Sequence, residues 1–339
     1  MEHSLTLIWF AIIAFGVFMY VFMDGFVLGI GILFGLKSSE TDRDILMNSV
    51  APIWDGNETW LVLGGAGLFA AFPLAYAVVL PALYLPLLVM LIALVFRGVA
   101  FEFRFKAKRR WGWDLAFTLG SLLATFAQGV ALGAFVQGFP VVDRQFAGGA
   151  LDWLTPFSLM TGLALIFGYM LLGSTWLIIK TRNSLQRWAY QLTKLLFMVV
   201  VLFMALVSLW VPFLDNNIAQ RWFSWPNIAY LSPMPLLVAA CTVGFYRTLR
   251  ERHEILPFVL AIALFLLNYV GLAISIWPNI IPPDISIWEA AAPPETQSFM
   301  LVGVVILIPI ILGYTAYSYW IFRGKISQDM GYHWAQNPL

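Results

Sequence analysis

The chain has 339 residues, of which 61% are hydrophobic and only 11% are charged, and its mean hydropathy is +0.84. A soluble protein carries about a quarter of its residues as Asp, Glu, Lys and Arg, so this composition excludes a soluble protein and indicates one that is embedded in a lipid bilayer. The net charge is only +1, and the single cysteine, Cys241, excludes an intrachain disulfide and a cysteine metal cluster; we expect no nucleic-acid partner.

Nine apolar runs are long enough to cross a membrane, whose hydrocarbon core of about 30 Å needs about 20 helical residues. The first run is too long for a signal peptide and lacks a small-residue cleavage site behind a basic leader, so we expect it to be retained. The predicted fold class is therefore all-α, a polytopic membrane protein with a single membrane domain over 1–339. The predicted spans are 6–36, 51–73, 80–105, 114–139, 155–180, 190–212, 232–250, 256–278 and 298–322.

The basic residues predict the orientation of these spans. Of the nineteen Lys and Arg residues, sixteen fall in one set of alternate loops or in the span ends next to them, Arg144 and Arg221 fall in the other set, and Arg97 alone lies in the interior of a span. Loops that carry the excess of Lys and Arg face the cytoplasm. We therefore expect a multi-pass protein of the bacterial inner (cytoplasmic) membrane, with its amino terminus periplasmic and its carboxyl terminus cytoplasmic.

The first predicted span carries an acid, Asp24, about 12 residues before its cytoplasmic end, which is roughly 18 Å at about 1.5 Å per residue. Asp24 should therefore lie near the middle of the membrane. An ionisable side chain at that depth costs at least about 2.5 kcal/mol and usually has a partner, a water-filled cavity or a proton to carry. One reading is proton relay; the other is a buried carboxyl that bonds a neighbouring hydroxyl or amide.

The second predicted span begins with Trp54-Asp55-Gly56-Asn57-Glu58. Offsets of three and four residues place Asp55, Glu58 and Thr59 on one helix face, and the two acids lie shallower than Asp24. The three acids could form a ladder of oxygen groups that leads inward from the cytoplasm and relays protons. The competing reading is that Asp55 caps its helix and Glu58 reaches the interface.

The third predicted span contains Arg97, five residues before Glu102. A buried guanidinium needs a counter-ion or an anionic ligand, and Asp55, Glu58 and Glu102 are candidates at a similar level. We favour a structural ion pair over a ligand clamp. Arg97 and Glu102, together with Trp54 and Asn57, are therefore assigned a structural or charge-pairing role.

The histidines exclude some chemistry. His3, His253 and His333 all lie at termini or in loops, so no predicted span offers an imidazole to a haem iron or a copper centre. We expect no haem ligand and no metal site in this chain. A phosphate-binding Gly-rich loop followed by Lys and Ser or Thr is also absent, which argues against an ATP-driven machine.

Four segments together carry a family resemblance. They are Asp24-Gly25-Phe26 with the glycines after it, residues 51–57 (Ala-Pro-Ile-Trp-Asp-Gly-Asn), residues 97–104 (Arg-Gly-Val-Ala-Phe-Glu-Phe-Arg), and residues 308–317, which run into Tyr319-Trp320. In order and spacing they resemble subunit II of the bacterial cytochrome bd quinol oxidases, from the first span to the ninth.

The resemblance implies a heterodimer with subunit I, which binds haems b and d and the quinol, and in which quinol is oxidised and O2 reduced to water. It implies nine helices in two four-helix bundles, here 6–139 and 155–278, plus one peripheral helix, 298–322. In the family, the residue that stands here as Asp55 belongs to a proton route from the cytoplasm towards haem d, and the acid that stands as Asp24 lies nearby. The reaction would then be electrogenic without proton pumping.

Two departures limit the transfer of roles. Many members have a second aspartate where this chain has Val27, and some have glutamine where this chain has Glu58. Some relatives hold a structural quinone or lipid in this subunit, or recruit a small single-helix accessory subunit; the sequence decides neither.

Two other functions stay open on the residues alone. One is a proton-coupled secondary transporter. Many such transporters contain internal sequence repeats, and the two halves of this sequence are only faintly alike, for example residues 29–33 and 173–177. The other is a membrane scaffold that only stabilises its partner.

Overall fold

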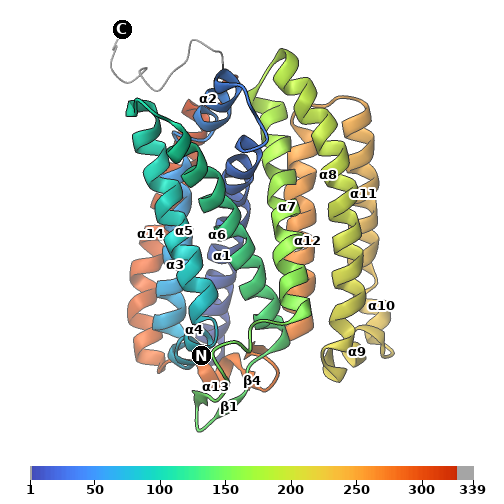
Figure 1. The fold of residues 1–339 in the computed structure, drawn as a ribbon. Helices are drawn as coiled ribbons and strands as arrows, with labels where there is room; N and C mark the ends of the chain where they lie inside the picture. The colour runs from blue at the N-terminus through green and yellow to red at the C-terminus, as the bar shows by residue number, and fades with distance from the viewer. Residues whose placement is uncertain (1, 327–339) are drawn as a thin grey trace.

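Long antiparallel helices run between two ends of the molecule (Figure 1). The structure is a computed structural model that describes residues 2–326. His333 and the carboxyl terminus, which we expect to be cytoplasmic, lie outside the described residues, as does Met1. The helix α2 (Glu40–Asn48) lies at one end, here called the α2 end, and α13 (Ile287–Ala290) lies at the opposite end.

The other elements follow in chain order. The long helices are α1 (Glu2–Phe34), α3 (Trp54–Ala71), α5 (Tyr84–Phe103), α6 (Trp111–Gln137), α7 (Pro156–Lys180), α8 (Asn183–Trp210), α11 (Pro233–Arg250), α12 (Leu256–Ile276) and α14 (Pro294–Ile321). The short helices are α4 (Pro73–Ala82), α9 (Asn216–Phe223) and α10 (Asn227–Leu231), with two 3₁₀ turns, Arg104–Lys106 and Val211–Phe213. Two antiparallel hairpins pair β1 (Val141–Val142) with β2 (Gln145–Phe146), and β3 (Asn279–Ile281) with β4 (Ile285–Ser286).

Within the described residues, eight helices are long and apolar enough to cross a membrane: α1, α5, α6, α7, α8, α11, α12 and α14. The all-α membrane fold is thus confirmed, whereas the count of nine spans is not. Each predicted span overlaps a helix. The helix α3, which overlaps the second predicted span, is not apolar enough to be counted as a membrane span. Its first turns carry Asp55, Asn57 and Glu58, whose polar side chains lower its hydropathy.

The stretch between the second and third predicted spans folds differently from the expectation. It forms the separate short helix α4, which begins at Pro73 directly after the end of α3. Proline is favoured in the first helical turn because its missing N–H is not needed there. The backbone then breaks at Leu83, and α5 begins at Tyr84 rather than near residue 80.

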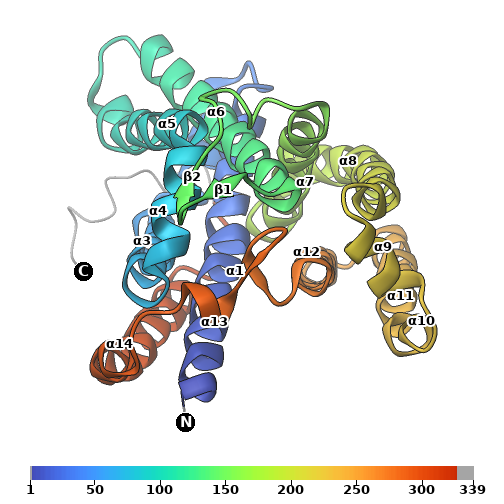
Figure 2. The same cartoon turned by 90° about the horizontal axis from the view of Figure 1, so that it is seen from below.

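The helix α1 runs from its amino end at the edge of the array to a buried second half that lies among α3, α6 and α7 (Figure 2). It crosses α7 where both helices carry a glycine. A Cβ atom on Gly29 would lie 1.8 Å from the carbonyl oxygen of Tyr169, and one on Gly173 would lie 2.8 Å from the backbone of Gly29. Glycine at both positions lets the two backbones approach more closely than any other residue would allow.

The end opposite α2 is closed by the two hairpin loops. The N–H of Phe139 donates to the carbonyl of Pro282 (3.1 Å). The residue before Phe139, Gly138, has φ +85°, and a Cβ there would lie 2.4 Å from the same Pro282 carbonyl oxygen. Only glycine combines this backbone conformation with this contact.

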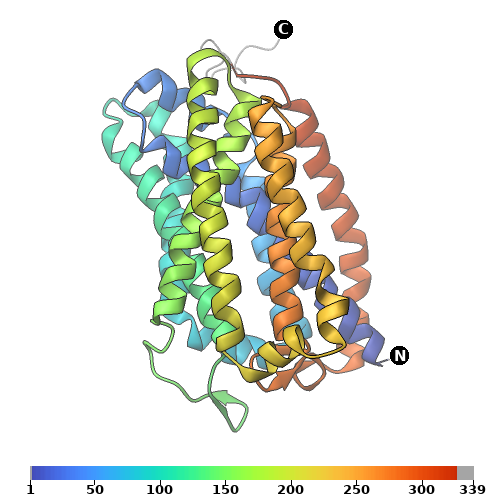
Figure 3. The same cartoon turned by 90° about the vertical axis from the view of Figure 1, so that its right-hand side faces the viewer.

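The helix α14 lies at the edge of the array (Figure 3) and is mostly exposed. Its carboxyl end is held at the α2 end by Lys180, whose ammonium donates to the carbonyl of Phe322. The ammonium of Lys325 donates to the Thr181 carbonyl (3.1 Å) and pairs with Glu254 (2.8 Å). Hydrogen bonds from Lys325 and Gln186 hold the pKa of Glu254 below its usual range.

Candidate functional site

A buried arginine joins the first three long helices of the chain. Arg97, on α5, is fully buried, and its Nη1 donates to Oδ1 of Asp24 on α1 (2.6 Å). Its Nη2 donates to Oε1 of Glu58 on α3. Asp24 is also fully buried, whereas the side chain of Glu58 is 30% exposed. The cluster therefore reaches from the interior of the array to its surface.

The charges in this cluster depend on one another. Removing one member of a buried ion pair leaves an uncompensated charge in a medium of low dielectric constant, at a cost of about 3–5 kcal/mol. One guanidinium here faces two carboxylates, so the cluster carries a surplus negative charge when all three groups are ionised. A surplus carboxylate that reaches the surface is a group that can take up a proton.

Two of the other predicted site residues, Asp55 and Glu102, do not reach Arg97. Asp55 is exposed on α3 and forms no hydrogen bond or ion pair with another described residue. Glu102 is also exposed, and its carboxylate lies 4.0 Å from Lys106. Of the three counter-ions that we expected for Arg97, the structure therefore brings only Glu58 to it, and Asp24 supplies the second.

Trp54 and Asn57 hold the start of α3 in place. Trp54 stacks on Phe101 with ring centroids 4.9 Å apart and an interplanar angle of 7°, and the guanidinium of Arg97 lies 5.8 Å from its ring. The Asn57 amide donates to the carbonyl of Met23 (2.9 Å) and accepts from the Tyr319 hydroxyl (3.0 Å). Asn57 thus ties α3 to α1 and to α14, beside the buried acid.

A small cleft opens next to Asn57, between residues 52–57, which lead into α3, and residues 314–319 of α14. Its volume is about 10 Å³, which is room for about one water molecule. Asn57, Ser318 and Tyr319 supply polar groups to its lining. The cleft therefore lies at the edge of the charged cluster and suits a bound water.

A chain of three polar side chains continues from the cluster into the interior, and the predictions from sequence did not include it. The Tyr169 hydroxyl donates to Oε1 of Gln128 (2.9 Å), and Nε2 of Gln128 donates to the Tyr20 hydroxyl (2.8 Å). Tyr20 lies one turn before Asp24 on α1, and its hydroxyl faces that carboxylate. The spacing of four residues was the signal in the sequence that could have indicated this contact.

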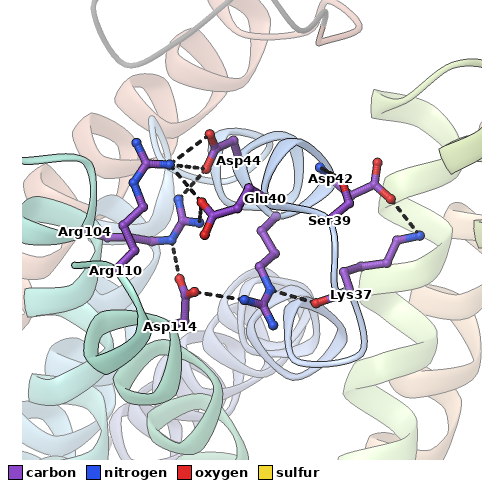
Figure 4. A network of polar contacts seen from close by, with 9 residues as sticks. Lys37, Ser39, Glu40, Asp42, Asp44, Arg104, Arg110 and Asp114 are labelled. Atoms are coloured by element: carbon purple, nitrogen blue, oxygen red, sulfur yellow. Dashed lines mark hydrogen bonds and ion pairs between the residues drawn. The ribbon is translucent and has the colours of Figure 1, made fainter. Parts of the chain in front are cut away.

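A second charged cluster lies at the α2 end and was also missed (Figure 4). The guanidinium of Arg104 is buried and pairs with Asp114 (2.5 Å) and Asp44 (2.5 Å). Arg43 pairs with Asp114 as well (3.0 Å) and donates to the Lys37 carbonyl (2.7 Å). These bonds fix α2 against the ends of α5 and α6, and α2 leads directly into the start of α3.

The donor groups for a haem or a metal ion are poorly placed in this chain. Among residues 2–326, no group of three or more His, Cys, Asp and Glu side chains is arranged to hold a metal ion. His3 packs edge-on against Trp288 near the amino end of α1, and His253 bonds Glu251 in an exposed loop. Both histidines are exposed, so within residues 2–326 neither offers its imidazole to the interior of the helix array.

Comparisons with known proteins cover nearly the whole chain. A family model described as cytochrome bd terminal oxidase subunit II matches residues 5–322. The chain is 28% identical over 363 residues to cytochrome bd-I ubiquinol oxidase subunit 2 of Escherichia coli K12, covering 96% of each protein. It is 27% identical over 339 residues to cytochrome bd ubiquinol oxidase subunit 2 of Bacillus subtilis 168, covering 96% of this chain and 97% of that protein.

A solved structure has the same fold. A chain of the bd oxidase from Geobacillus thermodenitrificans superimposes with a TM-score of 0.76 at 15% identity, covering 94% of this chain and 98% of that one.

Proposed function

Because the chain belongs to the cytochrome bd terminal oxidase subunit II family, we propose that it supplies part of the cytoplasmic proton pathway of its oxidase complex. It is a component of a bd-type quinol oxidase, which works together with a subunit I. The match over the whole chain does not favour the secondary-transporter alternative. In the proposed pathway, Asp55, Glu58 and Asp24 exchange the protons, and Arg97 holds the last two in place.

One observation carries this proposal: Glu58 bonds a fully buried guanidinium while its own side chain is 30% exposed. Asp55 lies three residues earlier on the same helix and is exposed, and Asp24 is fully buried on the far side of Arg97. Exposure therefore falls in steps from Asp55 to Glu58 to Asp24. Such a gradient suits protons that are exchanged at the surface of α3 and held beside Arg97.

We assign the haems b and d, the quinol site and the reduction of O2 to subunit I. The support is that the described residues of this chain place no histidine inside the helix array. Reduction of O2 to water consumes protons, so a feed from the cytoplasm would make the reaction electrogenic without pumping. We propose that subunit I covers the exposed acids of α3 and receives these protons.

We also propose the finer architecture. The helix α3, which overlaps the second predicted span, would complete the count of nine spans, because the residues that lower its hydropathy are the acids that a partner would cover. The bundles would be 6–139 and 155–278, with 298–322 peripheral. The excess of Lys and Arg in one set of loops supports an orientation with the α2 end in the cytoplasm.

The test replaces Asp55 with Asn and, separately, Glu58 with Gln in the complete complex. Each amide keeps the size of the side chain and can still accept a hydrogen bond, but it cannot carry a proton. We expect oxygen uptake with quinol to fall by about tenfold or more, while the haem content per complex stays that of the unmodified oxidase.

The matched control is Glu251→Gln, which neutralises an exposed acid in the loop between α11 and α12 and should leave oxygen uptake unchanged. Full turnover in both Asp55→Asn and Glu58→Gln would reject the pathway and leave a scaffold role for this subunit.

A further inference from the structure

The polar chain Tyr20–Gln128–Tyr169 joins three helices next to the proposed pathway. Tyr20 is on α1 and is 4% exposed, Gln128 is on α6, and Tyr169 is on α7 and is fully buried. Both hydrogen bonds have ordinary lengths, 2.8 and 2.9 Å. A polar chain of this kind in an apolar interior is kept only when its members satisfy one another.

The direction of the hydrogen bonds leaves one hydroxyl hydrogen without an acceptor among these three side chains. A tyrosine hydroxyl has one hydrogen to donate, and Tyr169 gives its hydrogen to Gln128. Tyr20 accepts from Gln128, so its own hydrogen is free for another acceptor. Of the two tyrosines, Tyr20 therefore keeps a free donor, and it lies at the end next to Asp24.

Asp24 has an acceptor that lacks a donor. Its Oδ1 binds Arg97, whereas its buried Oδ2 has no hydrogen-bond partner among the described residues. A buried acceptor without a partner costs about 1–3 kcal/mol, and more when it is charged. The Tyr20 hydroxyl, one helical turn away and facing this carboxylate, is placed to satisfy it directly or through one water molecule.

For proton transfer, the Tyr20–Gln128–Tyr169 chain ends at Gln128. A carboxamide offers two donors and one acceptor, but unlike a carboxyl or a phenol it is not a group that gives and takes protons in acid–base chemistry. Beyond Gln128, the Tyr169 ring packs on α1, where a Cβ on Gly25 would lie 2.7 Å from it, and stacks on Phe265. Protons on Asp24 therefore have no relay that leads further towards α6 and α7 along this chain.

We propose that Tyr20 is a positioning residue that holds Asp24 through its second oxygen, and that Gln128 ends the proton route on its inner side. Protons on Asp24 then exchange by way of Glu58 and the exposed face of α3 rather than through Gln128. This inference rests on the proposed pathway and gives it a direction. The groups that face Asp24 are Arg97 on α5, Glu58 on α3, Tyr20 on its own helix, Tyr169 on α7 and Tyr319 on α14.

The experiment compares Tyr20→Phe with Tyr269→Phe in the purified oxidase complex. Tyr269 is a matched control, because its hydroxyl also bonds α1, at the Ala14 carbonyl (3.0 Å), away from Asp24. We expect Tyr20→Phe to lower oxygen uptake by roughly tenfold and to displace its pH profile at full haem content. Tyr269→Phe should keep both the rate and the pH profile.

A second variant, Gln128→Leu, removes the bond that orients Tyr20 and leaves both tyrosines in place. We expect the same displaced pH profile, with a smaller loss of rate. An unchanged rate and pH profile in both Tyr20→Phe and Gln128→Leu would overturn the inference. Asp24→Asn separates the two ideas: if it is slow while Tyr20→Phe is normal, only this inference fails, and if it is also normal, Asp24 is not part of the pathway.

Discussion

Replacing Arg97 with methionine is expected to prevent assembly of the oxidase complex. The variant strands the fully buried Asp24 and takes away the partner of Glu58. Breaking a buried pair in this way costs about 3–5 kcal/mol, which is a large part of the about 5–15 kcal/mol that stabilises a folded protein. Because Arg97 joins α1, α3 and α5, the loss falls on the packing of all three helices.

The measurement is the amount of this subunit and of haem in membranes that express the Arg97→Met variant. Lys106→Met is the matched control, since Lys106 is 70% exposed and lies 4.0 Å from a half-exposed Glu102; exposed pairs contribute about 0–1 kcal/mol. We expect nearly normal levels from Lys106→Met and almost none from Arg97→Met. Normal haem content in Arg97→Met would show that the cluster is not required for folding.

Alanine in place of Gly29 should be the most damaging single-methyl change at the crossing of α1 and α7. The added Cβ would lie 1.8 Å from the Tyr169 carbonyl, which is backbone and cannot rotate away. Overpacking a close contact costs about 1–3 kcal/mol and occasionally more; here we expect the upper end, because the two helices must separate. The separation would also move Tyr169, and with it the bond to Gln128.

Thermal unfolding of the complex, followed by loss of the haem spectrum, measures this effect. Gly303→Ala is the comparison, because a Cβ on Gly303 of α14 meets nothing within 4 Å in this chain and alanine is the better helix former. Gly29→Ala should unfold at a clearly lower temperature, and Gly303→Ala should not. Equal unfolding temperatures would mean that α1 and α7 can adjust at their crossing.

The sequence predicted the helices well and their lateral contacts poorly. Apolar runs identify spans because the hydrocarbon thickness sets their length, but α4 was missed because its residues are as apolar as those of the spans around it. Arg97 was expected to need an acid, and it pairs with Asp24 and Glu58. Asp24 was not among the acids considered for it, because the contact depends on the rotation of α1 and α5 about their axes, which local spacing does not determine.

The remaining contacts were missed for a related reason. Counting Lys and Arg by loop uses the sign and side of each charge, so it treats Arg104 as one more cytoplasmic residue. Its burial between Asp44 and Asp114 depends on how α2 folds back over α5 and α6. Similarly, Tyr20, Gln128 and Tyr169 lie far apart in the chain and meet only because α1, α6 and α7 pack together.

Asp55 shows the limit of one chain considered alone. It is exposed and bonds neither Asp24 nor Arg97 among the described residues, so the ladder of three acids stays a prediction. In the proposed complex this exposure becomes useful, since a carboxylate at the surface of α3 can exchange protons with the cytoplasm or with subunit I. The functional unit is then formed between two chains, and no pattern within one sequence describes it fully.

Proton uptake by the complex is the measurement that tests this account most directly. The oxidase is reconstituted in vesicles, fully reduced and mixed with O2, while a pH indicator follows the medium on the side of the α2 end. For Glu58→Gln we predict that proton uptake and the linked step of O2 reduction both slow by about tenfold or more, at normal haem content. Proton uptake at the rate of the unmodified complex would contradict the claim that this subunit carries protons to the reaction.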